Sequence, residues 1–456
     1  MLARKSGKRQ METEIELHID TLAFQGGGVA RHTEGTQAGK KVFVLGALPG
    51  DTVMARILSQ DKRHDQALCV RVIEPSPARR AAACPASDSC GGCPLQTLAR
   101  SEQLRWKRRF VEDALMHIGG FAQTEVSGLM QDCVSAGDEW GYRNKVEFEV
   151  AAQGNRLALG MHSRGSEVFV PVERCLLLPK GYEDAPKRLA GALSYALKED
   201  GALLRRVGIR VSRITRAVEV ALWMEPGPCK RSFVARVIGD ALPSTSLVRV
   251  LIDGETAARK VKGVEALAGR GYWRESLNDY EYRISAPSFF QVNTPVAQRM
   301  VTATLDLLKP TGKRVLDLYS GAGSFTLPLA EHASEVEAVE LEGSSIRDLR
   351  RNLEVNGLDA LAHGGDVARM LPDLVPADAA IIDPPRSGLS PEARTALIAA
   401  RIPLLAYVSC DPTTLARDLR ALVTGGYEVR NVLSYDLFPQ TYHVESLVLL
   451  ESCATR

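Results

Sequence analysis

A single cysteine, Cys410, follows an apolar run at residues 404–409. A run of this length is typical of a buried strand, so the thiol is expected at a strand end, where it can act as a soft nucleophile. Upstream, residues 317–323 form a loop that contains Gly321 and Gly323 and follows another apolar run. Because glycines let the backbone approach a ligand closely, this loop can hold a nucleoside cofactor. Together the two segments predict an enzyme that activates its substrate covalently while a bound cofactor delivers a group.

Two acidic positions suit a nucleoside pocket beside this loop. Glu340 ends the next predicted strand, about 17 residues after Gly323, where a carboxylate can accept hydrogen bonds from ribose hydroxyls. Asp383 ends a later strand, at the edge where open α/β sheets bind ligands. The loop lacks the third glycine of a dinucleotide fingerprint, which leaves a dinucleotide oxidoreductase or a plain glycine turn as alternatives.

This order of strand, glycine loop, helix, strand and terminal acid resembles class I S-adenosylmethionine-dependent methyltransferases. The resemblance implies S-adenosylmethionine as cofactor, with Glu340 on the ribose and Asp366 near the adenine. In adenine-N6 methyltransferases, a motif similar to residues 383–386 ends in an aromatic residue that stacks on the base. Here that residue is Arg386, which disfavours methylation of an amine.

Methylation of carbon 5 of a pyrimidine needs both a nucleophile and a base. A thiolate that adds to carbon 6 turns the ring into an enolate, whose carbon 5 can attack a methyl sulfonium. A base must then remove the proton on carbon 5 so that the thiol can leave. Cys410 fits the first role, with a buried structural cysteine as the alternative, and Glu445 or His443 fits the second.

Three segments, residues 288–293, 408–419 and 438–446, resemble motifs of the RNA uracil-5 methyltransferase family. The resemblance implies that Cys410 is the nucleophile and that Glu445, in preference to His443, is the base. It departs from the family pattern at Ser324 and Asp411, where asparagine is common. Arg386 is expected to orient the pyrimidine or the catalytic loop. The resemblance places six residues in the cofactor and substrate pocket: Gln291, Tyr319, Ser324, Glu340, Asp366 and Asp383.

Three cysteines, Cys84, Cys90 and Cys93, lie within ten residues, and Cys175 is the candidate for a fourth ligand. Thiolate-only sets suit zinc or iron–sulfur centres, and the residue types do not choose between them. The spacing resembles the [4Fe-4S] site of the 23S ribosomal RNA uracil-5 methyltransferases, which implies an iron–sulfur cluster with a structural role. Three cysteines so close together are seldom unligated.

The elements that must position these residues follow two patterns. Residues 13–74 alternate between short strands and glycine turns, as in a small β-barrel, and resemble a TRAM domain, an OB-like RNA-binding barrel. A cap without RNA contact is the alternative for this segment. From residue 290, strands alternate with helices near 325–332, 344–356, 391–400 and 412–424, which predicts a doubly wound parallel sheet that ends in an antiparallel hairpin.

The fold class expected is therefore α/β, with a Rossmann-like methyltransferase domain, an N-terminal OB-like barrel and a central α+β cluster-binding domain. The expected TRAM barrel covers residues 1–75. The central iron–sulfur and RNA-binding domain covers residues 76–95 and 121–286. The methyltransferase domain covers residues 96–120 and 287–456, with the helix near 96–118 packed on it.

Composition bounds the remaining possibilities. The 456 residues carry a net charge of +2, and no apolar run or N-terminal segment predicts a membrane span or secretory signal, so a cytoplasmic location is expected. Nine cysteines, an odd number, argue against a disulfide framework. Two basic stretches, residues 100–109 and 201–216, could neutralise phosphates or form a solvated face.

The family resemblance implies an enzyme that forms 5-methyluridine in 23S rRNA, using S-adenosylmethionine and a [4Fe-4S] cluster. Because the uridine lies in folded RNA, it must be flipped out of its stack. No membrane and no obligate protein partner are expected. The same chemistry on tRNA, or a noncatalytic RNA-binding iron–sulfur protein, are the alternatives.

Overall fold

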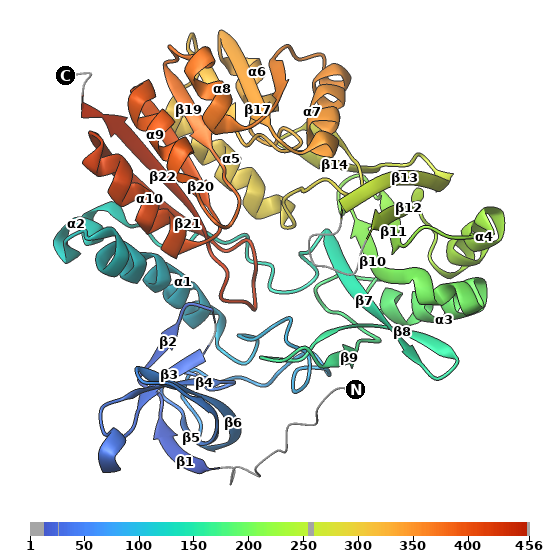
Figure 1. Cartoon of the computed structure of the whole chain (residues 1–456), viewed down its shortest axis with the longest axis vertical. Helices are drawn as coiled ribbons and strands as arrows, with labels where there is room; N and C mark the ends of the chain where they lie inside the picture. Colours follow the sequence, from blue (N-terminus) through green and yellow to red (C-terminus); the bar gives the residue numbers. More distant parts are fainter. Residues whose placement is uncertain (1–12, 26, 254–259, 454–456) are drawn as a thin grey trace, which may run out of the picture.

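The computed structural model describes residues 13–25, 27–253 and 260–453. Within these residues the strands form two seven-stranded sheets, one six-stranded sheet and one two-stranded sheet. Figure 1 shows the N-terminal sheet in blue, the central sheet in green and the C-terminal sheet in yellow to red, around a junction of loops. The mixed α/β class expected from the sequence is confirmed.

The N-terminal region is β-rich, as expected, and its strands form one sheet in the order β1-β5-β6-β4-β3-β2. Alternate residues face its core, for example Val42 and Val44, which are both fully buried. A parallel pair joins β4 to β6, and the neighbouring pairs are antiparallel. Its elements are β1 (Glu14–His18), β2 (Thr21–Ala23), β3 (Gly27–Arg31), the 3-10 turn η1 (Gly35–Gln37), β4 (Lys41–Leu45), β5 (Thr52–Gln60) and β6 (His64–Glu74).

The central sheet has the order β13-β12-β11-β10-β7-β8-β9 and carries two helices that pack against each other. Strand β11 is buried along its whole length. A separate hairpin, β14–β15, follows it in the chain. The elements are β7 (Lys145–Gln153), β8 (Arg156–His162), β9 (Phe169–Pro171), α3 (Ala185–Leu197), η3 (Lys198–Leu203), β10 (Leu204–Val211), β11 (Val218–Met224), α4 (Arg231–Ala241), β12 (Ser246–Asp253), β13 (Lys260–Gly269), β14 (Trp273–Leu277) and β15 (Tyr280–Ile284).

The C-terminal sheet has the order β18-β17-β16-β19-β20-β22-β21. Its first five strands are parallel, and β22 joins β20 and β21 antiparallel, which confirms the doubly wound sheet and the closing hairpin. The elements are α5 (Thr294–Leu308), β16 (Arg314–Leu318), α6 (Thr326–His332), β17 (Glu335–Glu340), α7 (Gly343–Asn356), β18 (Leu361–Gly364), α8 (Val367–Leu374), β19 (Ala379–Ile382), α9 (Pro391–Ala400), β20 (Leu404–Ser409), α10 (Pro412–Thr424), β21 (Tyr427–Tyr435) and β22 (Glu445–Ser452).

Helices cover both faces of this sheet because successive strand residues point to opposite sides. Leu316 and Leu318 of β16 belong to the apolar cluster that includes α8, α9 and α10. Val315 belongs to the cluster on the other face, with α5, α6 and α7. Both faces of the sheet are therefore covered by apolar side chains, and the polar residues expected to do chemistry lie at the ends of the strands.

A helix from early in the chain completes one of these faces. Helix α1 (Arg100–Ala114) continues into a π-helical turn, η2 (Leu115–Gly119), and is followed by α2 (Gln123–Leu129). Val111 and Leu115 are buried in the same apolar cluster as Leu419 of α10. The helix therefore packs on the C-terminal sheet although about 200 residues of the central region separate them in sequence.

None of the helices within the described residues has the length and apolar character needed to cross a membrane.

Candidate active site

The carboxyl ends of the parallel strands bring together the residues expected to do chemistry. The register pairs Leu318 with both Val339 and Ile382, and Ile382 with Tyr407, so β16, β17, β19 and β20 all end at the same edge. The side chains that follow these strand ends lie at the edge where α/β sheets bind ligands. They are Tyr319, Glu340, Asp383 and Cys410.

Cys410 and Glu445 meet across two antiparallel strands. Ser409, the last residue of β20, is paired with Ser446 of β22. Cys410 directly follows Ser409, and Glu445 directly precedes Ser446 at the start of β22. After burial, Glu445 is also the largest influence on the pKa of the Cys410 thiol, so the two side chains lie close together at the end of this strand pair.

Burial and neighbouring acids determine the protonation of this pair. Burial, together with Glu445 and Asp383, raises the pKa of the Cys410 thiol to about 12, against an opposing effect from Arg386. Glu445 is 4% exposed, and burial together with Asp383 raises its pKa well above the ordinary value. Both pKa values are therefore raised above their ordinary values, and an added positive charge would favour the ionised forms of both groups.

Three acids next to this pair make the strand edge electronegative. Burial, together with Asp317 and Glu340, raises the pKa of Asp383 to about 8. Burial likewise raises the pKa of Asp317 to about 7, against a hydrogen bond from Thr326 Oγ1 at 2.5 Å. A buried cluster of carboxylates binds a cationic ligand well, since the ligand charge offsets their mutual repulsion. These residues fit the sulfonium cofactor expected from the sequence.

The glycine loop is folded tightly against Glu340. Gly321 donates its backbone N–H to Glu340 Oε2 at 2.8 Å, and the backbone N–H of Glu342 donates to Oε1 at 2.6 Å. Gly323 has a φ of 97°, and a Cβ there would lie 2.6 Å from a side-chain carbon of Leu349, so only glycine fits. The strand, loop and acid are thus arranged as the sequence predicts.

The other expected pocket residues surround the same loop. Tyr319 has a φ of 67°, and its pKa is raised to about 12 by burial and then by Asp366, which therefore lies nearby. Asp366 is exposed and caps α8 by accepting a hydrogen bond from Arg369 N at 3.2 Å. Ser324 is half-buried within the loop, and Gln291 is buried just before α5.

The segment that contains Asp383 and Arg386 is held to helix α10 by a residue that sequence analysis missed. Asp418 is fully buried and accepts hydrogen bonds at 2.8 Å from Leu389 N and from the Tyr407 hydroxyl, both through Oδ2. Its other oxygen pairs with Arg394 at 2.7 Å. A buried carboxylate with this many donors fixes the loop relative to the strand that leads to Cys410.

Arg386 lies at the start of the same helix. Its Nε is 3.4 Å from Asp411 Oδ2, and its side chain is half-exposed. Asp411 caps α10 by accepting from Thr413 N at 2.9 Å and Thr414 N at 3.3 Å. The arginine is thus tethered one residue from Cys410, and its exposed face is available to a substrate.

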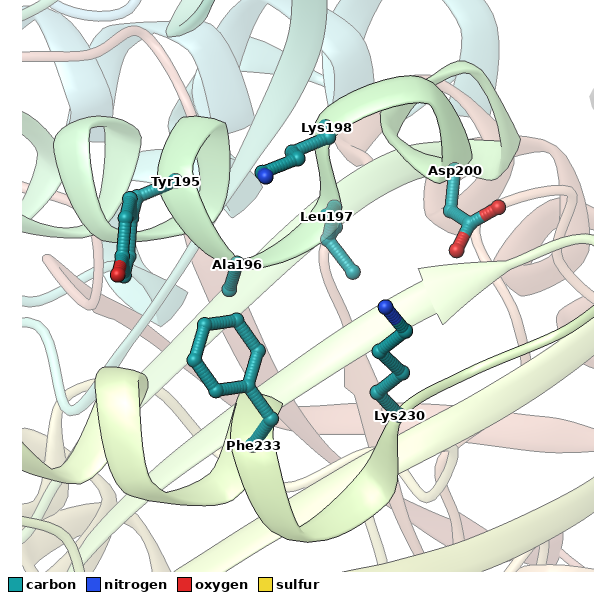
Figure 2. A pocket seen from close by; sticks show the side chains of 7 residues that line it. All are labelled: Tyr195, Ala196, Leu197, Lys198, Asp200, Lys230 and Phe233. Atoms are coloured by element: carbon teal, nitrogen blue, oxygen red, sulfur yellow. The ribbon is translucent and has the colours of Figure 1, made fainter.

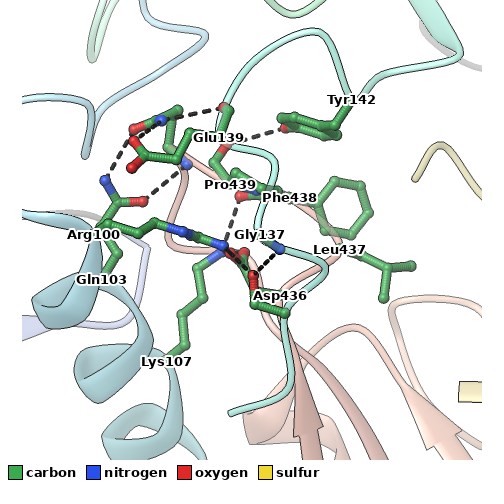
Figure 3. A network of polar contacts seen from close by, with 12 residues as sticks. Arg100, Gln103, Lys107, Gly137, Glu139, Tyr142, Asp436, Leu437, Phe438 and Pro439 are labelled. Atoms are coloured by element: carbon green, nitrogen blue, oxygen red, sulfur yellow. Dashed lines mark hydrogen bonds and ion pairs between the residues drawn. The ribbon is translucent and has the colours of Figure 1, made fainter. Parts of the chain in front are cut away.

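A network of buried polar groups fixes the loop between β21 and β22 that leads to Glu445 (Figure 3). Lys107 of α1 is fully buried, pairs with Asp436 and donates to the carbonyl of Phe438 at 2.9 Å. Arg100 pairs with the same carboxylate. The backbone carbonyl of Pro439 accepts a hydrogen bond from the Tyr142 hydroxyl at 3.0 Å.

Gln440 is the second anchor of this loop, and its φ of 70° is unusual for a residue with a side chain. Gln103 of α1 donates to Gln440 Oε1 at 2.9 Å and accepts from Gln440 N at 3.0 Å. Arg80 donates to the same Oε1 at 3.1 Å. Sequence analysis had no signal for these contacts, because each partner lies more than 300 residues away along the chain.

His443, the rival base, is poorly suited to the role. Burial and the cations Arg386, Lys107 and Arg143 lower its pKa to about 4. A group with that pKa is neutral at physiological pH and is a weak proton acceptor. Glu445, with a raised pKa, is the stronger base of the two.

The four cysteines of the expected cluster lie close together in the fold. Burial raises the pKa of Cys175 to about 11, and Cys90 and Cys84 raise it further. Cys93 is likewise affected by the other three thiols. Within the described ranges, however, no three side chains of His, Cys, Asp or Glu are placed closely enough to hold a metal ion. The four thiols are chemically suited to bind a metal centre, but their positions in the structure do not form a coordination site.

Known RNA methyltransferases are similar to this chain in sequence. The profile of the tRNA (Uracil-5-)-methyltransferase family matches residues 261–372 and 373–453. An uncharacterized RNA methyltransferase of Gloeobacter violaceus is 33% identical over 96% of both chains. Another, of Halalkalibacterium halodurans, is 31% identical over the same shares.

A solved structure resembles nearly the whole chain. It is the Pyrococcus abyssi tRNA (uracil-54, C5)-methyltransferase in complex with S-adenosyl-L-homocysteine. The two share 25% sequence identity and superpose with a TM-score of 0.73, over 96% of this chain and 100% of the other. All three sheets therefore have counterparts in one known architecture.

The Lys107–Asp436 pair yields a prediction for stability. Lys107→Met should lower the free energy of unfolding by about 3 kcal/mol, because a buried carboxylate loses its closest cation while only Arg100 remains. Arg105→Met, on the same helix but at an exposed pair with Glu102, should cost less than about 1 kcal/mol. Urea unfolding of both variants measures the difference, and equal losses would contradict the role of the network.

The raised pKa values predict a pH-dependent preference for a cationic ligand. Asp383 holds its proton at pH 6 and loses it above pH 8, so the attraction to a sulfonium should grow over this interval. The preference for S-adenosylmethionine over the uncharged S-adenosylhomocysteine should rise roughly tenfold, equivalent to about 1.4 kcal/mol. Calorimetric titration from pH 6 to 9 measures it. Asp383→Asn should flatten the rise, and identical pH profiles for the two ligands would exclude the electrostatic explanation.

Proposed function

The chain belongs to the RNA uracil-5 methyltransferase family, and we propose that it transfers a methyl group from S-adenosylmethionine to carbon 5 of one uridine in 23S rRNA. The observation that carries the proposal is the pairing of β20 with β22, which ends at Ser409 and Ser446 and brings Cys410 close to Glu445. A nucleophile and a base on the same face of a sheet, beside an acid-lined cofactor edge, suit the two half-reactions of this chemistry.

The roles of the two residues follow from the electron flow. The Cys410 thiolate adds to carbon 6 of the uracil, and the displaced electron pair moves to the carbonyl oxygen at carbon 4. Bound S-adenosylmethionine supplies the methyl group that carbon 5 then attacks. Glu445 removes the proton from carbon 5, the double bond between carbons 5 and 6 reforms, and the Cys410 thiolate leaves. Arg386, beside Asp411, is placed to favour the thiolate and to orient the ring.

The cofactor residues are proposed to contact different parts of the nucleoside. Glu340 holds the ribose through the lone pairs that the backbone of the glycine loop leaves available. Tyr319 and Asp366 lie toward the adenine, and Gln291 and Ser324 complete the pocket. Asp383, between the cofactor edge and the Cys410–Glu445 pair, faces the methyl donor and the substrate.

The RNA substrate is the finer part of the proposal. The four-cysteine set together with the β-rich N-terminal sheet favours 23S rRNA. The Pyrococcus abyssi protein, which is similar over nearly its whole length, acts on uracil 54 of tRNA, and this supports tRNA as the second candidate. Both RNAs would present the uridine to the same catalytic residues.

We further propose that Cys84, Cys90, Cys93 and Cys175 hold a [4Fe-4S] cluster, with zinc as the alternative. Support comes from the chemistry of the donor set and from the effect of the neighbouring thiols on the pKa values of Cys93 and Cys175. The role proposed is structural. Cys84 donates its backbone N–H to Gln96 Oε1 at 3.3 Å, next to the contacts that fix Gln440.

The organisation proposed on this basis has three domains. Residues 1–75 form the RNA-binding barrel, residues 76–95 and 121–286 form the central cluster-binding domain, and residues 96–120 with 287–456 form the methyltransferase domain. The packing of α1 against α10 supports the assignment of the inserted segment to the last domain.

Covalent trapping tests the chemistry. RNA that carries 5-fluorouridine should form a stable adduct with the protein in the presence of S-adenosylmethionine, because fluorine at carbon 5 blocks the final proton removal. Cys410→Ala should form none, while Cys453→Ala, a change at an exposed cysteine, should trap RNA normally. With unmodified RNA, Glu445→Gln should accumulate the adduct and turn over at least about a hundredfold more slowly.

The same assay discriminates between the candidate functions. Adducts with 23S rRNA fragments but not with tRNA support the proposal, and the reverse result moves the activity to tRNA. A protein that traps neither RNA would be a noncatalytic binder. Full turnover by Cys410→Ala would exclude the covalent mechanism.

Metal analysis tests the cluster. Anaerobically purified protein should contain about four iron atoms per chain and absorb visible light. Cys90→Ser should lose most of the iron and destabilise the protein, whereas Cys229→Ser, outside the set, should keep the normal iron content. Zinc without iron would replace the cluster proposal by its alternative, and unchanged iron in Cys90→Ser would remove Cys90 from the ligand set.

A further inference from the structure

A hollow lies where the three large sheets meet. It has a volume of about 390 Å³, within the range of small-ligand pockets. Figure 1 shows the loop between β21 and β22 reaching down toward the N-terminal sheet at this junction. The lining comes from segments far apart in the chain and includes Gln25, Leu45, Gly92, Arg164, Gly165 and Tyr442.

Arg164 brings a positive charge without a direct ion pair to this junction pocket. Its Nε is buried and has no hydrogen-bond partner, and within the described residues no carboxylate forms an ion pair with its guanidinium, although Asp88 acts on it at longer range. The guanidinium lies against the backbone of Gly46, where an added Cβ would be 3.0 Å from Nη1 of Arg164. A half-buried cation without a direct ion pair is costly, so the arrangement suits a ligand that brings negative charge.

Arg143 also has a buried Nε without a hydrogen-bond partner, but its guanidinium lies 5.7 Å from the centroid of the Phe438 ring. The two basic stretches that the sequence singled out as possible phosphate sites are largely paired within the protein. Arg108 pairs with Glu112 and Arg109 with Asp113 on helix α1. In the second stretch, the cationic side chains pair with acids on neighbouring segments: Arg205 with Glu225, Arg206 with Glu147, Arg210 with Glu219 and Arg213 with Asp138.

A row of aromatic rings runs from the pocket toward Glu445. The Tyr442 ring lies 6.1 Å from Phe24 of the N-terminal sheet region and 4.7 Å from His443. His443 in turn lies 5.7 Å from Phe438. Tyr442 and His443 are half-buried, so part of each ring is accessible. Nucleic-acid bases stack on such rings, and this stacking does not require a particular base.

We propose that the junction pocket binds one unstacked nucleotide of the RNA next to the reacting uridine, with Arg164 on its phosphate and Tyr442 against its base. The proposal rests on the proposed function, since it assumes an RNA substrate. Tyr442 is three residues before Glu445, so a nucleotide held here lies on the same loop that positions the base. The pocket thereby recognises RNA outside the reacting nucleotide.

A hollow on the central sheet provides a matched control (Figure 2). It has a volume of about 620 Å³ between α3 and α4 and also contains an aromatic pair, Tyr195 and Phe233, with ring centroids 5.6 Å apart. Lys198 and Lys230 supply positive charge, and Asp200 opposes it. In Figure 1 these helices lie on the side of the central sheet that faces away from the C-terminal sheet.

The experiment measures RNA binding and trapping by five full-length variants. Arg164→Ala should bind substrate RNA roughly tenfold more weakly and show a salt dependence smaller by about one phosphate contact. Tyr442→Leu should weaken binding by about five- to a hundredfold through lost stacking, with little change in the salt dependence. Lys198→Ala and Tyr195→Leu should stay within about twofold of the wild type. Arg164→Lys should restore most of the salt dependence, because it keeps the charge.

The outcomes separate this inference from the proposed function. If Arg164→Ala and Tyr442→Leu are folded, as shown by an unchanged thermal midpoint, and bind RNA like the two control variants, the pocket is not an RNA site. If Arg164→Ala unfolds, Arg164→Lys and Tyr442→Leu decide by the same criterion. A wild-type protein that forms no adduct with any 5-fluorouridine RNA would instead overturn the proposed function.

Discussion

The antiparallel register of β22 against β20 is the constraint on which the rest of the site depends. A shift of one residue would turn Glu445 to the opposite face of the sheet, away from Cys410. The loop before β22 is therefore the critical connection, and it is fixed at two points by α1, through Lys107 at Asp436 and Gln103 at Gln440. These contacts make the geometry of the base depend on a helix from the other end of the chain.

Burial of several acids in surroundings of low dielectric constant destabilises the free site, but it also favours the binding of a cation. Asp317, Asp383 and Glu445 are kept close together with raised pKa values, at a cost to the free protein. A cationic cofactor relieves that repulsion and shifts Cys410 toward its thiolate. In the proposed mechanism, cofactor binding and activation of Cys410 are then two consequences of one electrostatic arrangement, which would limit reaction of the thiol in the free protein.

The sequence predicts the parts of the site that local pattern encodes. Cys410 and Glu340 stand at the ends of apolar runs that predict strands. The carboxyl ends of parallel strands lie at the same edge of a sheet, so the sequence also predicts where these two residues lie. It does not predict Asp418, whose donors come from three segments, or the positive φ of Gln440. Helix α8 was missed because it is short and contains Pro372, and β18 because it lacks an apolar run. The sequence does not predict the ion pairs of the second basic stretch either, because their acids lie on neighbouring segments of the tertiary structure.

The junction of the three sheets explains why the architecture is noncontiguous. Asn144, just before β7 of the central sheet, donates to the carbonyl of Gln291 at 2.8 Å and to Thr294 at 3.1 Å, at the start of α5. Arg80, just after the N-terminal sheet, reaches Gln440. Each accessory sheet thus contacts a different wall of the site, one at the cofactor pocket and the other at the loop of the base. RNA that engages either sheet would meet a surface continuous with the reacting groups, so recognition and chemistry share the same anchors.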